Sequence, residues 1–333
     1  MSTPPISPGL WTLAWRRLRA DKLAMAALCV VSAFLVMLVL SSLGLIVADW
    51  EDEVGVAYAP PTFAGARQAV LAAAPQAQGA LPDNSFDPLA AELATLGVAT
   101  VKTAVAKRET LPFGADKWGH DIVKKTIKGA ETSIVVGLVA AFVAVTLGTI
   151  FGALSGYFGG VVDDLFNWFY SVFTSIPPIL MILTVAAVLQ QKGVLTIVLI
   201  LGLTGWTGPY RLIRAEYMKH KGREYVMAAD AIGASHWRKM FSHIFPNISH
   251  VALVQMSILV VGFIKAEVIL SFLGFGVPVG VVSWGSMLNE AQNELILGMW
   301  WQLSAAAVAM AVLVTAFSLF TDALRDALDP KLK

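Results

Sequence analysis

Residues 132–156 read TSIVVGLVAAFVAVTLGTIFGALSG, a run of 25 residues without a charged side chain. At 1.5 Å per residue, a helix of this length exceeds the roughly 30 Å hydrocarbon core of a bilayer. The whole chain shares this character, because 57% of its 333 residues are hydrophobic and only 14% are charged. Globular domains average about 45–50% apolar and about 25% charged residues. The sequence therefore predicts an integral membrane protein.

Charge and cysteine content argue against several other classes of protein. The chain has 24 Lys and Arg residues against 23 Asp and Glu residues, so its net charge of +1 provides no basic surface for a nucleic acid. The single cysteine, Cys29, excludes an internal disulfide and a cysteine-based metal site. We expect no catalytic residue, no cofactor and no metal in this chain.

Five further apolar stretches are long enough, or nearly long enough, to cross a bilayer. With the first run, the predicted spans are 23–48, 132–156, 166–189, 194–210, 251–272 and 299–320. We therefore predict an all-α polytopic membrane protein with about six transmembrane helices.

The distribution of basic residues predicts the orientation of these spans. Four of them (Arg16, Arg17, Arg19 and Lys22) precede the first span, seven lie between 211 and 239, and Arg325, Lys331 and Lys333 lie near the end. The short loops on the other side contain only Lys192. By the positive-inside rule, we expect cytoplasmic N- and C-termini.

The spans divide the chain into five predicted regions. They are an interfacial amphipathic helix (1–22), the first span (23–48), an extracytoplasmic segment (49–131), a core of five spans (132–322) and a cytoplasmic tail (323–333). The first region can equally be a simple basic flank. For 49–131 the sequence predicts no fold, and a small cap and a partly flexible loop both remain open.

The cytoplasmic segment 211–250 reads RLIRAEYMKHKGREYVMAADAIGASHWRKMFSHIFPNISH. It predicts a short helix over 224–232, which Gly233 ends in a left-handed conformation. Ser235 can cap a second helix that runs to Pro246, which is tolerated in the first turn of the next span. This helix, turn and helix would present a compact surface to a groove in another protein.

This segment resembles part of a known protein family. Met227-Ala228-Ala229, then Gly233, then residues 243–247 (HIFPN), resemble the EAA loop of binding-protein-dependent ABC importers in both pattern and spacing. Met227 stands where the family usually has Glu, and Glu224 is a candidate substitute. The resemblance assigns ATPase coupling to Glu224, Met227, Ala228, Ala229, Asp230, Gly233, Phe245 and Pro246.

Three other stretches are similar to the oligopeptide, dipeptide and nickel group of these permeases. They are FGADKWGHD at 113–121, Glu267 with LSFLGFG at 270–276 and SWG at 283–285, and the ending 322–330. The resemblance covers the chain from Leu111 onward, together with the basic helix and the first span. It implies a permease that moves its substrate inward by alternating access.

The resemblance also implies partners and a location. Since the chain contains no Gly-x-x-x-x-Gly-Lys-Ser/Thr phosphate loop, ATP hydrolysis is expected on two separate ATPase subunits, the same or related. A second, related permease would complete a heterodimer, an extracytoplasmic binding protein would deliver the substrate, and the site of action would be the lipid of the bacterial inner membrane. Di- and oligopeptides are the expected substrates.

Other substrates and a second class of transporter remain open. Nickel complexes, opines and oligosaccharides are alternative substrates within the same group. An ion-coupled secondary transporter is the competing class, although the sequence shows none of the internal repeats typical of that class.

Two features within the spans are candidates for the pathway or for the contact between permeases. Lys265 and Glu267 lie in a span, where charges are expensive and usually functional. Two residues apart on a helix, they point about 200° away from each other. We expect Glu267 to contact the partner permease or to line the pathway. Pro177-Pro178 predicts either a packing kink or a gating hinge.

Overall fold

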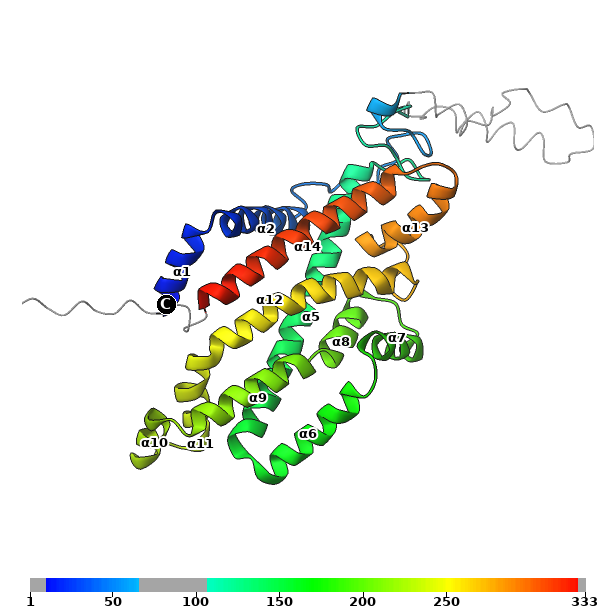
Figure 1. Cartoon of the computed structure of the whole chain (residues 1–333). Helices are drawn as coiled ribbons and strands as arrows, with labels where there is room; N and C mark the ends of the chain where they lie inside the picture. Colours follow the sequence, from blue (N-terminus) through cyan, green and yellow to red (C-terminus); the bar gives the residue numbers. More distant parts are fainter. Residues whose placement is uncertain (1–9, 66–106, 329–333) are drawn as a thin grey trace, which may run out of the picture.

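The computed structural model describes residues 10–65 and 107–328. These residues are almost entirely helical and contain no β-strand, only isolated β-bridges, which confirms the all-α class (Figure 1). The helices are α1 (Leu10–Ala20), α2 (Lys22–Ser42), α5 (Ile122–Phe158), α6 (Gly160–Thr174), α7 (Pro178–Leu189), α8 (Val194–Thr204), α9 (Thr207–Lys221), α10 (Glu224–Ala231), α11 (His236–Arg238), α12 (Phe245–Phe272), α13 (Trp284–Ile296) and α14 (Trp301–Leu328). Short segments complete them: a 3₁₀ turn at Thr62–Ala64 and a π-helical segment at Lys239–Ile244.

Within the described residues, four continuous helices are long and apolar enough to cross a membrane, and a bent pair makes a fifth. The four are α2, α5, α14 and the helical stretch that ends in α12. The bent pair is α6 and α7, which meet at 85° because the chain restarts its helix at Pro177-Pro178. The predicted span 194–210 is divided between α8 and α9 at Gly205-Trp206. The sequence therefore predicted the apolar stretches and, from Pro177-Pro178, a kink or hinge in one of them, but it missed the break at Gly205-Trp206.

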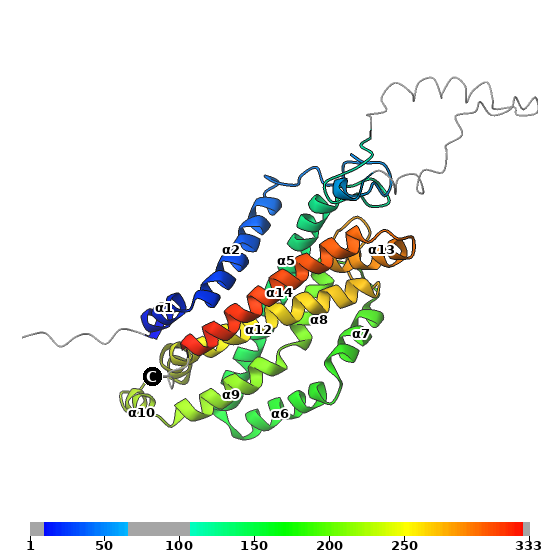
Figure 2. The ribbon, with the colours of Figure 1, turned by 45° about the horizontal axis from the view of Figure 1, so that its top comes forward.

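Helix α5 runs through the middle of the bundle (Figures 1 and 2). Its contact with α9 is made by Gly148, Gly152 and Gly156, which we call the glycine face. A Cβ atom at these positions would lie 2.6, 2.8 and 2.5 Å, respectively, from the backbone carbonyl oxygens of Trp206, which caps α9, and of Tyr210 and Arg214 within α9. Small residues at every fourth position allow helix backbones in a membrane to approach closely. The two helices are therefore packed backbone against backbone.

The main hydrophobic core lies between α5, α8, α12 and the final helices α13 and α14. A smaller core at the opposite end joins α5 and α9 to α10 and the start of α12. The bidentate ion pair between Arg214 of α9 and Asp163 of α6, with both N–O distances 2.6 Å, attaches α6 to the same end of the bundle.

The ends of the predicted extracytoplasmic segment form an ordered structure that we call the cap, residues 54–61 and 107–121. Isolated parallel bridges join its two halves at Gly55–Arg108 and Pro61–Leu111. The Trp301 indole N–H of α14 donates to the carbonyl of Ala115 at 2.7 Å, which fastens the cap to the bundle. Residues 66–106 lie outside the described residues.

Several observed helix ends differ from the predicted region boundaries. Helix α5 begins at Ile122, where the Asp121 side chain accepts from the backbone N–H of Val123 at 2.8 Å, so the boundary at 131/132 falls inside a helix. Helix α14 likewise continues through 322/323 to Leu328. In the N-terminal region, α1 covers Leu10–Ala20, and its Ala14 and Leu18 pack against α14; its position at the membrane interface stays a prediction.

Candidate functional site

The loop between α9 and α12, which we call the docking loop, forms a helix–turn–helix at the end of the bundle farthest from the cap (Figures 1 and 2). Helix α10 ends one residue earlier than predicted, at Ala231. Gly233 has φ +78°, and the N–H groups of Gly233 and Ala234 donate to the carbonyls of Asp230 (2.9 Å) and Ala229 (3.0 Å). The Ser235 hydroxyl accepts from the Arg238 N–H at 3.4 Å. The local conformation predicted from the sequence is therefore present.

The inner face of α10 packs into the smaller core. Val226 and Ala229 are buried, and Val226 lies in one cluster with Tyr217 of α9 and Met240 of the π-helical segment. The Tyr217 hydroxyl donates to the Met240 carbonyl at 3.2 Å. Because Ala153 and Tyr157 of α5 belong to the same cluster, a movement of α10 would reach α5, α9 and α12 through packed side chains.

The outer face of this loop is apolar and exposed. We call the residues Met227, Ala228, Ile232, Trp237 and Phe241 the docking face. Ile232 is 84% exposed, although a fully buried isoleucine gains about 1.5–3 kcal/mol over an exposed one. The rings of Trp237 and Phe241 are stacked, with centroids 5.7 Å apart. Exposed aromatic and aliphatic groups gathered in this way make the docking face a candidate interaction surface.

Sequence reasoning missed Ile232, Trp237 and Phe241 as candidates. The signal that could have found them is the occurrence of large apolar side chains in a loop otherwise dense in charge. The other predicted coupling residues fall into three groups. Glu224 and Pro246 are exposed, Phe245 is half-buried against the smaller core, and Asp230 forms an ion pair with Lys239.

The Asp230–Lys239 ion pair holds α10 against the π-helical segment. Hydrogen bonding to the Lys239 ammonium lowers the pKa of the Asp230 carboxyl below its ordinary value, so the ionised form is favoured. The Lys239 side chain is buried, whereas the Asp230 side chain is exposed. A second polar contact lies nearby, between the Tyr157 hydroxyl and the His236 Nδ1 at 3.0 Å. These contacts fix the position of the docking face.

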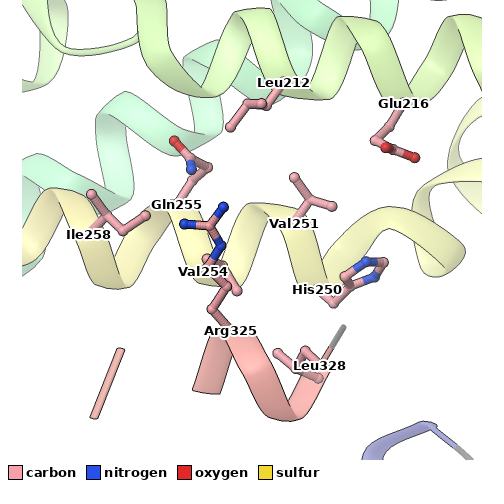
Figure 3. A pocket seen from close by; sticks show the side chains of 9 residues that line it. All are labelled: Leu212, Glu216, His250, Val251, Val254, Gln255, Ile258, Arg325 and Leu328. Atoms are coloured by element: carbon pink, nitrogen blue, oxygen red, sulfur yellow. The ribbon is translucent and has the colours of Figure 1, made fainter. Parts of the chain in front are cut away.

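A cavity of about 450 Å³ lies where α9, α12 and the end of α14 meet (Figure 3). Its walls are mostly apolar, with Glu216 on α9, His250 on α12 and Arg325 on α14 as the ionisable groups. Figure 3 shows Arg325 reaching toward Gln255 of α12, with Glu216 on the far side. The helices joined to the docking loop are thus separated here by open space, which leaves room for movement between them.

Glu267 and Lys265 lie on different sides of α12, as their spacing predicts. Lys265 is exposed and Glu267 is fully buried. The Glu267 carboxylate accepts from the hydroxyls of Ser133 (2.6 Å) and Ser271 (2.7 Å), and Ser133 in turn accepts from the Trp284 N–H at 3.2 Å. In this structure Glu267 therefore joins α5, α12 and α13 within one chain. Its roles at a permease contact or along the pathway stay predictions.

Pro177 and Pro178 are both exposed and lie at the bend between α6 and α7. Pro178 is the first residue of α7, a position at which its missing N–H does not interrupt a helical hydrogen bond. The 85° bend is far larger than a packing kink within one continuous helix. A hinge movement at this bend remains a prediction.

Comparisons with known proteins place most of this chain in one family. Residues 148–333 match the family described as binding-protein-dependent transport system inner membrane component, and residues 9–61 match the N-terminal TM domain of oligopeptide transport permease C. The dipeptide transport system permease protein DppC of Lactococcus lactis is 30% identical over 318 residues, covering 96% of this chain and 90% of that protein. The Bacillus subtilis proteins of the same type, DppC and OppC, are 36% and 37% identical over 221 residues. Each alignment covers 66% of this chain, with 69% of DppC and 72% of OppC.

Proposed function

Because the chain belongs to the binding-protein-dependent transport system inner membrane component family, we propose that it is the permease subunit of an ATP-driven importer of di- and oligopeptides. The match along 96% of the chain to a dipeptide transport permease carries this proposal. The protein is a multi-pass component of the bacterial inner membrane. Its own task is to form a path for the substrate.

Energy is supplied by partners in this proposal. Two ATPase subunits bind at the docking faces of this chain and of a second, related permease, and a binding protein delivers the peptide on the side of the cap. The docking loop and both termini then face the cytoplasm. Two observations support this arrangement: the positive charge lies around the loop, and the cap and the docking face are at opposite ends of the bundle.

The geometry suggests how ATP hydrolysis moves the spans. Closure of the ATPases displaces α10, and Val226 transmits this displacement to Tyr217 and Met240 in the smaller core. Helices α5 and α9 respond as one rigid body, because their backbones are in contact along the glycine face. The cavity between α9, α12 and α14 allows this body to shift relative to the rest of the bundle.

The proposed function is tested by reconstituting the permease pair with its ATPases in lipid vesicles. We expect ATP hydrolysis to rise when the binding protein and a di- or tetrapeptide are added together, and labelled peptide to accumulate inside the vesicles. Stimulation by a nickel complex, an opine or an oligosaccharide instead would overturn the peptide assignment. Uptake driven by an ion gradient without ATPase subunits would overturn the importer assignment.

Replacing Ile232 with Glu is expected to weaken ATPase binding. The substitution puts a charge into the apolar docking face, and loss of one central apolar contact in an interface costs about 2 kcal/mol or more. Co-purification of the ATPase subunits with the tagged permease measures the effect. Ile296→Glu is the matched control, since Ile296 is 83% exposed and lies on α13, near the cap. Equal retention of ATPase by both variants would place the docking surface elsewhere.

A further inference from the structure

Glu294 is a buried carboxyl group without a hydrogen-bond partner. It lies in the last turn of α13 and is 2% exposed. Neither of its carboxyl oxygens forms a hydrogen bond within the described part of the chain. Placing a charged group in such surroundings is expensive unless a counter-charge and hydrogen bonds compensate.

The positive charge that acts most strongly on Glu294, the Lys125 ammonium, is already paired with two other carboxylates. The buried Lys125 ammonium of α5 donates to Asp116 of the cap at 2.7 Å and to Glu290 of α13 at 2.6 Å. Asp116 also binds the His120 ring at 2.9 Å. Glu294 is thus the third carboxyl group around one ammonium, and it makes no direct contact with that ammonium.

The other groups that interact electrostatically with Glu294 form no hydrogen bond with it in the described part of the chain. Lys117 and Tyr58 of the cap are near enough to interact with it electrostatically. Helix α14 contributes the uncharged Trp301 and Gln302 to this region, and the Gln302 amide already donates to Glu290 at 3.1 Å. Burial raises the pKa of the Glu294 carboxyl to about 7. Asp116 and Glu290 add to this effect, and Lys125 opposes it.

We propose that Glu294 is a proton-binding site at the junction of the cap with α13, and that its occupancy stabilises the folded chain. The bound form is the neutral carboxylic acid, which can be buried without a counter-ion. The junction lies on the side that we place outside the membrane, so the proton would come from the external medium. This site is independent of what the transporter carries.

The direction of the pH dependence follows from linkage. Because the folded chain binds this proton more tightly than the unfolded chain, stability falls as the pH rises from about 4.5 toward 7 and is level above that range. The pKa of Glu294 in the folded chain, about 7, lies above the ordinary glutamate value, so the folded chain binds this proton more tightly than the unfolded chain. By contrast, the Lys125 ammonium and its hydrogen bonds outweigh the effect of burial on the Asp116 carboxyl and lower its pKa, so Asp116 stays ionised across this range.

The experiment is a pH titration of the full-length permease in lipid nanodiscs, followed by infrared difference spectroscopy. We expect the carbonyl stretch of a protonated carboxylic acid to disappear with a midpoint near pH 7 in the parent protein and to be absent from Glu294→Gln. Glu109→Gln, at an exposed position of the cap, should keep it. Absence of this signal from the parent protein, or its persistence in Glu294→Gln, would overturn the proposal.

Two further measurements test the surroundings and the consequence. Glu290→Gln should move the midpoint to lower pH, because it removes a neighbouring negative charge and frees Lys125; an unchanged midpoint would overturn the proposed cluster. The midpoint temperature of thermal unfolding, measured by tryptophan fluorescence between pH 5 and 8, should fall with rising pH in the parent protein. It should fall less in Glu294→Gln, because the glutamine side chain is neutral at every pH. Parallel pH profiles would overturn the link between protonation of Glu294 and stability.

Discussion

Gly233→Val is expected to lower peptide uptake about tenfold in a transporter that still assembles and hydrolyses ATP. Gly233 has φ +78°, and a Cβ atom placed there would meet no other atom within 4 Å. The effect of the substitution therefore comes from the backbone alone. A β-branched residue in the left-handed region costs about 1–2 kcal/mol, so the turn relaxes and α10 leaves the orientation that its contacts require. About 1.4 kcal/mol corresponds to a tenfold change in a conformational equilibrium.

The measurement compares ATP hydrolysis and uptake in the same vesicles. The matched control is Gly222→Val, because Gly222 precedes α10, has equally open surroundings and has φ −89°. The control should keep both activities. Normal uptake by Gly233→Val, or equal loss in both variants, would show that the left-handed turn is not required for coupling.

Gly152→Leu is expected to prevent the chain from folding into a stable transporter. A Cβ atom at this position would lie 2.8 Å from the carbonyl oxygen of Tyr210, and backbone atoms cannot move aside as a flexible side chain can. Leucine adds three more carbons, so α5 and α9 must separate along the glycine face. We expect a loss of more than about 4 kcal/mol, a large share of the 5–15 kcal/mol that usually stabilises a protein.

The amount of monodisperse protein recovered from membranes measures this loss, together with its thermal midpoint. Gly152→Ala should be intermediate, since it introduces only the first of the clashing atoms. Gly262→Leu is the control, because Gly262 lies within α12 and a Cβ atom there would meet nothing within 4 Å. If Gly152→Leu gave as much folded protein as the control, the close contact between α5 and α9 would be disproved.

Local features of this protein were predictable from the sequence. Hydropathy locates the apolar stretches because each span must satisfy its own backbone hydrogen bonds. The turn at Gly233, the helix N-terminus capped by Ser235 and the position of Pro246 in the first turn of a helix depend only on neighbouring residues, and all three are present. The opposite orientations of Lys265 and Glu267 follow from helical spacing alone.

Features that depend on distant residues were not predictable in the same way. The acceptor position of Glu267 requires Ser133, which lies 134 residues earlier, and no local pattern joins them. The break in the predicted span 194–210 lies at Gly205, whose surroundings include Phe263 of another helix, whereas the bend at Pro177-Pro178 has a local cause and was predicted. The spacing of Gly148, Gly152 and Gly156 was visible in the sequence, but only the structure identifies α9 as the helix that it faces.

The length of α5 has a mechanical consequence. Its 37 residues correspond to about 55 Å, well beyond the roughly 30 Å needed to cross the hydrocarbon core. One end holds Lys125 beneath the cap, and the other holds Tyr157 in the smaller core behind the docking face. One continuous helix therefore connects the two ends of the bundle. If α5 tilts as a rigid body, a displacement of one end moves the other end directly, and no loop has to transmit the movement.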